Sequence, residues 1–145
     1  MEIKTAKIED IDKLIPALLE LRPHRSRKEL KEMIAKMMVD GVRLIYIGND
    51  EIAFSVAAYR KLNMIFSGRT LYLDDLITIN THRGKGYAGR LIDWLIAYGE
   101  NNSYDLLSLD SGFNRKDAYR LYLNKGFEIT ALHFAKSFLK DNIKD

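Results

Sequence analysis

The pattern of apolar and polar positions changes period within the first thirty residues. Residues 2–6 alternate, which predicts a short strand. Apolar residues over 8–19 recur at helical spacing, and Pro16 within this run is expected to kink or shorten the helix. Ser26 and Glu29 are spaced as a capping box, so a second helix is expected to begin after Ser26.

The rest of the chain has the pattern of a meander followed by alternating strands and helices. The second helix is expected to end at Asp40-Gly41, where glycine can take a left-handed backbone. Glycine-bearing turns at 48–50 and 67–69 separate strand-like runs, and Gly99 is expected to stop a third helix. The predicted elements are strands over 42–47, 51–60 and 70–79, a helix over 87–99, a strand over 104–109, a helix over 115–125, and a strand over 127–139 whose end could equally be helical.

The resulting order of elements is β-α-α-β-β-β-α-β-α-β. It predicts the fold class α/β, with a mixed sheet and helices on both faces. The chain has 145 residues and no repeat or linker-like stretch. We therefore expect a single domain over residues 1–145.

The amino-acid composition excludes some classes of functional site but does not select one function. There are 23 Lys and Arg against 20 Asp and Glu, and the net charge of +3 permits an anionic ligand without favouring nucleic acid. The absence of cysteine excludes thiolate zinc sites and a cysteine nucleophile, and three scattered histidines make a metal site unexpected. No apolar run approaches the roughly 18 residues that span a bilayer, and no secretory signal is recognisable, so a cytoplasmic location is expected.

The segment from 71 to 91 carries the clearest chemistry. A strand runs into Arg83-Gly84-Lys85-Gly86-Tyr87-Ala88, and an amphipathic helix follows. Glycines let the backbone approach a ligand closely, the first amides of a helix have no internal partner, and the helix dipole favours negative charge there. The Arg and Lys side chains add positive charge, so a pyrophosphate fits this turn.

The glycine spacing selects among phosphate-binding sites. The P-loop pattern is absent. The dinucleotide fingerprint can be forced onto Gly84, Gly86 and Gly89, but it then lies past the middle of the chain instead of in a first βαβ unit. The sequence therefore supports a phosphate site of another kind.

Two sequence motifs, one in this segment and one further along the chain, suggest a protein family. The pattern Gln/Arg-x-x-Gly-x-Gly/Ala is matched by Arg83, Gly86 and Ala88, and Ala-x-x-x-Tyr followed by Gly-Phe is matched by Ala118, Tyr122, Gly126 and Phe127. In both motifs and in length the chain resembles the GNAT superfamily of acetyl-coenzyme A-dependent N-acetyltransferases. It also resembles a bacterial branch of that superfamily in four short motifs, Leu21-Arg22-Pro23, Asp74-Asp75-Leu76, Leu109-Asp110-Ser111-Gly112 and His133-Phe134.

The resemblance implies acetyl-CoA as co-substrate and assigns residues to bind it. The backbone of Ile77, Thr78 and Ile79 would lie along the pantetheine arm, with an N–H near Ile77 as the oxyanion donor. Residues 83–88 would wrap the pyrophosphate. The family's Asn before the Tyr motif falls on Arg115 here, with Asn114 beside it, so either residue is expected to contact the coenzyme.

Tyr122, Asp74 and Asp110 are the implied catalytic residues. Tyr122 matches the family's general acid, and a free pKa of about 10 keeps a tyrosine protonated at neutral pH. The alternative is a tyrosine that only packs in the core. Asp74 is a candidate base, and Asp110 falls where some members carry a catalytic Glu. The alternatives are a salt bridge for Asp74 and helix capping for Asp110.

The neighbouring strand positions Asp74 and Asp75 are expected to face opposite sides of the sheet, with Asp74 on the same side as Tyr72, Leu76 and Thr78. Asp75 is expected to contact substrate. Burial of an unpaired carboxylate disfavours its charged form and would raise the pKa of Asp74, which suits a base.

The acceptor is expected to be a primary amine of a small molecule or peptide. Arg22 lies in a basic stretch between the first two helices and suggests an acidic or carboxylate-bearing amine, unless that stretch is merely a solvated loop. His133, on a predicted strand, is a second candidate substrate contact. The apolar end around Phe134 and Phe138 could support a homodimer.

Two rival functions remain open at this point. One is an acyl-CoA-binding or regulatory domain of the same fold without catalysis, which would keep residues 83–88 but need neither Tyr122 nor Asp74. The other is nucleic-acid binding, against which the small net charge argues.

Overall fold

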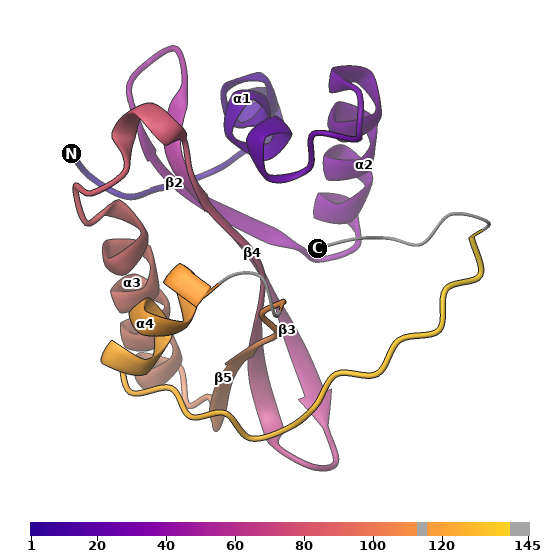
Figure 1. The fold of residues 1–145 in the computed structure, drawn as a ribbon, viewed down its shortest axis with the longest axis vertical. Helices are drawn as coiled ribbons and strands as arrows, with labels where there is room; N and C mark the ends of the chain where they lie inside the picture. Colours follow the sequence, from indigo (N-terminus) through magenta and orange to yellow (C-terminus); the bar gives the residue numbers. More distant parts are fainter. Residues whose placement is uncertain (113–115, 140–145) are drawn as a thin grey trace. The chain divides into compact units, whose positions relative to one another are not determined.

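The computed structural model describes residues 1–112 and 116–139 (Figure 1). The chain forms two compact units, Met1–Leu109 and Asp110–Asp145. The single domain expected over the whole length stays a prediction. No helix among the described residues is long and apolar enough to cross a membrane.

The first unit contains a five-stranded sheet in the order β1-β2-β3-β4-β5. β1 to β4 are antiparallel neighbours, and β5 lies parallel to β4. The predicted mixed sheet is confirmed. Its strands are β1 (Lys4–Thr5), β2 (Arg43–Gly48), β3 (Ala53–Met64), β4 (Gly68–Thr78) and β5 (Leu106–Leu109).

Three helices of the first unit cover the sheet, and a fourth lies in the second unit. The α-helices are α1 (Ile11–Leu21), α2 (Arg27–Val39), α3 (Tyr87–Asn101) and α4 (Lys116–Asn124), and the short 3-10 helices are η1 (Ile8–Asp10) and η2 (Asn80–His82). The capping box predicted for α2 is present, since Ser26 Oγ accepts from the Glu29 N–H and Glu29 Oε1 accepts from the Ser26 N–H.

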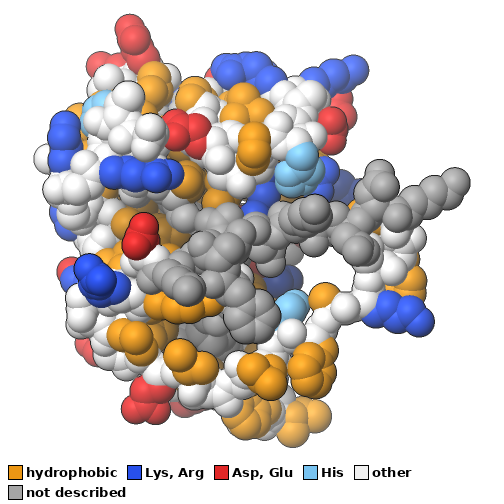
Figure 2. Space-filling model, in the orientation of Figure 1, with side chains coloured by type: hydrophobic (Ala, Val, Ile, Leu, Met, Phe, Trp, Pro, Cys, Tyr) orange, Lys and Arg blue, Asp and Glu red, His pale blue; other side chains and the backbone are white. Residues whose placement is uncertain are grey.

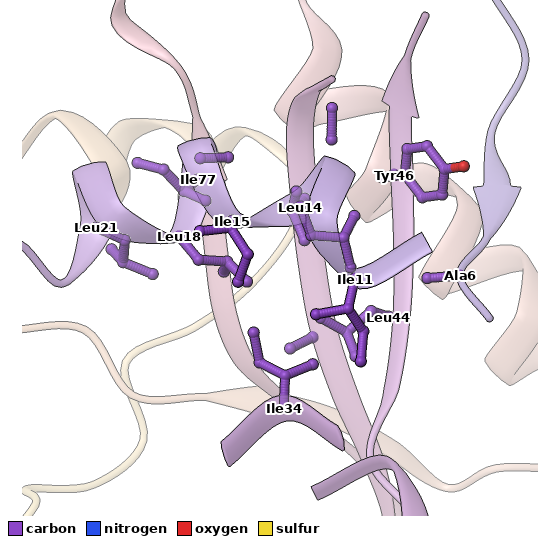
Figure 3. Close-up of a cluster of buried hydrophobic side chains, with 14 of the residues drawn as sticks. Ala6, Ile11, Leu14, Ile15, Leu18, Leu21, Ile34, Leu44, Tyr46 and Ile77 are labelled. Atoms are coloured by element: carbon purple, nitrogen blue, oxygen red, sulfur yellow. The ribbon is translucent and has the colours of Figure 1, made fainter. Parts of the chain in front are cut away.

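Two hydrophobic clusters lie on opposite faces of the sheet. One joins α1 and α2 to the sheet, and Figure 3 shows Ile34 of α2 pointing toward Ile15 and Leu18 of α1, with Ile11 beside Leu44 of β2. The other joins α3 to the opposite face through residues such as Leu71, Leu91 and Leu95. Each fully buried side chain of this size stabilises the fold by about 1.5–3 kcal/mol. The helices therefore lie on both faces, as the sequence predicts.

A β-bulge at Asp74 divides β4 into two parts. On β3, Ala58 pairs with Asp75 and Tyr59 with Leu73, so Asp74 is an extra residue without a cross-strand partner in the register. The bulge corrects the expected alternation, because the Asp74 and Asp75 side chains both line one pocket beside α1 and α2.

The same bulge corrects the expected neighbours of Asp74. Tyr72 lies on its side of the sheet, since Arg60 contacts both the Tyr72 ring and the Asp74 carboxylate. Leu76 packs instead with the cluster under α3, and Thr78 contacts Ser55 on that same face. The expectation assumed that side chains alternate regularly along the whole strand. An inserted residue moves every later side chain to the opposite face, so the alternation does not hold across the bulge.

Several element ends differ from the sequence prediction. Pro16 lies within α1, which nevertheless continues to Leu21 because its apolar face is buried against the sheet. Gly99 does not stop α3, which ends at Asn101. A side-chain carbon at this position would make ordinary contact with Leu71 Cδ1, at 3.4 Å. β3 extends to Met64, so the turn before β4 covers 65–67.

The strand predicted over 127–139 is not formed, and neither is the alternative helix. Its large apolar side chains are exposed, as Phe134 at 87% and Phe138 at 95% illustrate. The alternating pattern alone does not produce a strand, because a strand also needs a partner for its backbone groups.

Candidate active site

β4 has a free edge beyond the bulge. Its pairing with β5 ends at Leu73, which lies opposite Leu109, and no described strand pairs with β4 after that point. The Ile79 N–H donates to Phe54 on β3 over 2.8 Å, and backbone groups alternate in direction along an antiparallel strand. Ile77 and Ile79 therefore direct their backbone groups toward β3, in contrast to their expected place along the pantetheine arm. Leu76 and Thr78 direct theirs to the free edge.

The loop after β4 has the geometry of an anion site. Gly84 and Gly86 both have φ of +79°, and a side-chain carbon at either would meet nothing within 4 Å. The left-handed backbone, and not crowding, is therefore what requires glycine there. Gly86 precedes α3 without a side-chain cap, and the first turn of α3 carries no acidic residue.

The amides at the start of α3 consequently remain available to a ligand. The Arg90 N–H is the first of the helix to bond back, donating to the Gly86 carbonyl over 3.1 Å. The N–H groups of Tyr87 and Ala88 precede it and have no carbonyl of the helix to bond. Lys85 and Arg83 are exposed beside them and add positive charge.

Contacts from three directions hold this loop. Arg83 Nε donates to the Thr78 carbonyl over 3.3 Å, and Glu20 Oε1 on α1 accepts from the Asn80 N–H over 2.9 Å. The His82 ring stacks on Phe54 of β3 with centroids 3.9 Å apart. Strand edge and anion loop are thus adjacent along the chain and fixed to one scaffold.

A pocket of about 310 Å³ opens on the α1 and α2 side of β4. Most of its lining is apolar, and its charged residues come from β4 and the end of α1. The lining residues are Leu18, Leu21, Arg22, Arg25, Leu30, Met33, Ile34, Met37, Val42, Leu44, Ala58, Asp74 and Asp75. Predicted site residues Arg22, Asp74 and Asp75 are thereby brought to one place.

Asp74 is the most buried carboxylate of this pocket. Its side chain is 17% exposed, and Arg60 Nη2 lies 3.1 Å from Oδ1. Oδ2 is buried and has no hydrogen-bond partner among the described residues. Burial raises the pKa of Asp74, the Arg60 guanidinium lowers it in part, and Asp75 raises it further.

The two pocket arginines each lie against a carboxylate. Arg22 Nη2 donates to Asp75 Oδ1 over 3.2 Å, and Arg25 Nη1 lies 3.6 Å from Glu29 Oε2. Figure 2 shows Lys and Arg side chains beside Asp and Glu on this end of the molecule, over α1 and α2. Positive charge at the pocket is therefore matched within the protein.

The second unit contains the remaining predicted residues that the structure describes. Tyr122 lies on α4, and its ring meets Phe127 edge to face with centroids 5.9 Å apart. His133 Nδ1 lies 3.5 Å from Asp110 Oδ2, with both side chains about half exposed or more. His133 does not lie on a strand, in contrast to the sequence prediction. Asn114 and Arg115 lie outside the described residues.

Sequence reasoning missed three contributors to this region. Arg60 was treated only as part of a strand, and its ion pair with Asp74 depends on a register that the sequence does not encode locally. Glu20 reaches a loop sixty residues away. Met33 and Met37 line the pocket. Their helical spacing places them on one face of α2 with Leu30 and Ile34, but it does not show that the space beside them is open.

The free edge and the anion loop together define an α/β protein that can hold an extended, phosphate-bearing ligand along one strand. The chain belongs to the Acetyltransferase (GNAT) family, whose family model matches residues 13–127. Family membership confirms the resemblance drawn from the two motifs and supports the prediction of an N-acetyltransferase.

Individual relatives agree with this assignment. Over 73 residues, half of the chain, it is 38% identical to the uncharacterized N-acetyltransferase YhdJ of Bacillus subtilis (strain 168), and the match spans about half (51%) of that protein. It is 21% identical over 140 residues to the aminoalkylphosphonate N-acetyltransferase of Salmonella typhimurium (strain LT2), covering 94% of this chain and 90% of the relative.

Solved structures share the fold. The aminoglycoside N-acetyltransferase AAC(6')-Iy, solved in complex with CoA, superposes with a TM-score of 0.81 at 16% identity, covering 95% of each chain. At this identity the likeness concerns the fold alone, and it confirms the predicted GNAT-like architecture.

Proposed function

We propose that this chain transfers an acetyl group from acetyl-CoA to a primary amine. The observation that carries the proposal is the free edge of β4 running directly into the anion loop of Gly84 and Gly86. The edge suits an extended pantetheine-like chain, and the loop suits a pyrophosphate. Family membership and the CoA complex of a protein with this fold support the same ligand.

Backbone groups do most of the binding in this proposal. Leu76 offers its N–H and C=O groups at the edge and Thr78 its N–H, since the Thr78 carbonyl accepts from Arg83. An N–H of this edge is the proposed donor to the oxygen that gains negative charge. Ile77 and Ile79 keep the edge in place by pairing with β3. Residues 83–88 hold the pyrophosphate. When bound, acetyl-CoA supplies the acetyl group as a thioester.

Three side chains are proposed to move protons or contact the acceptor. Asp74 takes a proton from the acceptor ammonium, because its carboxylate lines the pocket and its raised pKa suits a base. Tyr122 Oη is the proposed proton donor to the leaving thiolate. Asp110 is a proposed acceptor contact in the second unit, together with His133.

A thermal-shift titration with acetyl-CoA, CoA and NADH tests the coenzyme site. Ligand at about 100 times its Kd adds roughly 2.7 kcal/mol, which shifts Tm by several degrees in a domain of this size. We expect shifts with acetyl-CoA and CoA and none with NADH. The absence of any shift with millimolar acetyl-CoA would refute the proposed coenzyme site and the enzyme with it.

Release of the CoA thiol in the presence of amines tests catalysis. Tyr122→Phe is expected to lower kcat about 10²–10⁴-fold while leaving the acetyl-CoA shift intact. Tyr119→Phe is the matched control, because it removes a hydroxyl from the same helix, one that donates to the Gly112 carbonyl. A coenzyme shift without turnover of any amine identifies the rival, a coenzyme-binding domain without catalysis.

The finer features of this function are also proposals. The acceptor amine belongs to a small molecule or a peptide, catalysis needs no metal, and the protein acts in the cytoplasm without a membrane or nucleic-acid partner. A homodimer through the apolar segment around Phe134 and Phe138 is proposed as well. Measurement of the molar mass in solution, beside a variant with both phenylalanines changed to Ser, tests that arrangement.

A further inference from the structure

The lining of the α1–α2 pocket limits what can bind in it. Its walls are mainly aliphatic and thioether side chains from α1, α2 and β2. Burial of an apolar group against these walls is therefore favourable. Met33 and Met37 are unbranched, adapt to varied shapes, and make favourable sulfur contacts with aromatic rings. A volume of about 310 Å³ is at the lower end for sites that enclose small organic ligands.

The charges around the pocket limit its ligand further. Arg22 lies against Asp75, and Arg25 lies against Glu29, so neither arginine offers an unmatched positive charge to a carboxylate or phosphate. Asp74 is different, because Arg60 contacts only one of its two oxygens. The other, Oδ2, is buried without a hydrogen-bond partner among the described residues. The Asp74 carboxylate lines the pocket, is 17% exposed and therefore keeps capacity for a further hydrogen-bond donor.

We infer that the acceptor is an apolar primary amine, of the arylalkylamine type, that carries no anionic group. Its hydrocarbon part fills the pocket between α1 and α2, and its ammonium group donates to the Asp74 carboxylate. This inference rests on the proposed acetyl transfer and names its substrate class. It replaces the carboxylate-bearing amine suggested by the basic stretch around Arg22, since Arg22 and Arg25 each already lie against a carboxylate.

The position of Asp74 connects this pocket to the free edge. Asp74 and Thr78 lie four residues apart on β4, which corresponds to roughly 13 Å along a strand. Leu76 lies halfway between them and presents its backbone to the free edge. An amine held at Asp74 is thus one or two residue lengths from the edge where the thioester is proposed to bind.

Three amines that differ in their apolar body and anionic group distinguish the chemistry. 2-Phenylethylamine has the apolar body alone, phenylalanine adds a carboxylate to it, and 2-aminoethylphosphonate has the anion without the apolar body. We expect kcat/KM for 2-phenylethylamine to exceed that for each anionic amine at least tenfold, because a buried anion without a partner loses its hydration. Equal or greater activity with phenylalanine or 2-aminoethylphosphonate would overturn the inference and leave the acetyltransferase intact.

A substitution in the pocket supplies a second measurement. Met33→Glu places a charge on the pocket wall at a residue 36% exposed, so the fold should tolerate it. We expect at least a tenfold rise in KM for 2-phenylethylamine and no change in KM for acetyl-CoA. Val39→Glu is the control, because Val39 lies on the same helix, is 81% exposed and does not line the pocket. An equal effect of both variants would contradict the assignment.

Binding can also be observed without turnover. Methyl resonances of Met33 and Met37 are expected to shift when 2-phenylethylamine is added, while that of Met64, in the β3–β4 hairpin, stays unchanged. Unchanged pocket methyls in a protein that still binds acetyl-CoA would overturn the substrate class. Loss of the acetyl-CoA thermal shift would instead refute the proposed function, so the two failures are distinguishable.

Discussion

Glu20 on α1 accepts a hydrogen bond from the backbone N–H of Asn80, sixty residues further along the chain, over 2.9 Å. Two residues later on the same helix end, Arg22 donates to Asp75. The end of α1 is therefore attached to β4 on one side of the free edge and to the anion loop on the other. The α1–α2 pocket and the anion loop therefore share this support.

Removal of the Glu20 carboxylate is expected to weaken coenzyme binding without touching the coenzyme. In Glu20→Ala the Asn80 N–H loses its partner, so the loop before α3 is held less firmly, and stability falls by about 1 kcal/mol. We expect KM for acetyl-CoA to rise severalfold, measured by thiol release. Glu20→Gln keeps an acceptor oxygen and should retain most of the wild-type value. An unchanged KM in the Ala variant would show that the contact is only structural.

The glycine at the start of α3 allows a matched comparison. Gly86→Ala forces a side chain into a left-handed backbone, and Gly41→Ala does the same in the turn after α2, where φ is +107°. Both variants should lose about 1 kcal/mol of stability or more. Only Gly86→Ala is expected to raise the Kd for CoA, by about tenfold, in calorimetric titration. Equal affinities in the two variants would remove the anion loop from the coenzyme site.

Asp74 should give the protein a characteristic dependence of stability on pH. Its folded-state pKa is raised above the ordinary 3.8 by burial, so the folded chain holds this proton more tightly than the unfolded chain. The resulting stabilisation is fully present below pH 3.8 and is lost as pH rises through the raised pKa. Asp74→Asn cannot titrate at this position.

We therefore expect the Tm of Asp74→Asn, relative to wild type, to increase as pH rises from 3.8 through the raised pKa and then to level off. Thermal denaturation of both proteins across that range measures the difference. Asp12→Asn removes an exposed carboxylate from α1 and serves as the control for the loss of one charge. A constant difference between Asp74→Asn and wild type would show that Asp74 titrates normally.

Features that depend on neighbouring residues in the sequence could be predicted well. The capping box of Ser26 and Glu29 needs only a spacing of three, and the turn of Gly84 and Gly86 needs only glycine before an amphipathic helix. Both are found as expected. The family motif of Arg83, Gly86 and Ala88 likewise depends only on residues that are close together in the sequence.

Features that depend on pairing between distant residues could not be predicted from the chain alone. The side of the sheet on which Asp75 lies follows from the offset between Ala58 and Leu73, which no local pattern records. The prediction of a strand over 127–139 is wrong for a related reason, since alternation specifies which side chains share a face but supplies no partner strand. The ion pair of Arg60 with Asp74 also follows from the register.

The bulge in β4 has a consequence for how such a site can change. On both sides of Asp74 the pairing is that of an ordinary strand one residue shorter, with Leu73 under α3 and Asp75 beside α1. Deletion of Asp74 would leave every other side chain of β4 on its present face. The proposed base is thus a separable addition to a complete sheet. Insertion or deletion of one codon would therefore add or remove this carboxylate without repacking either hydrophobic cluster.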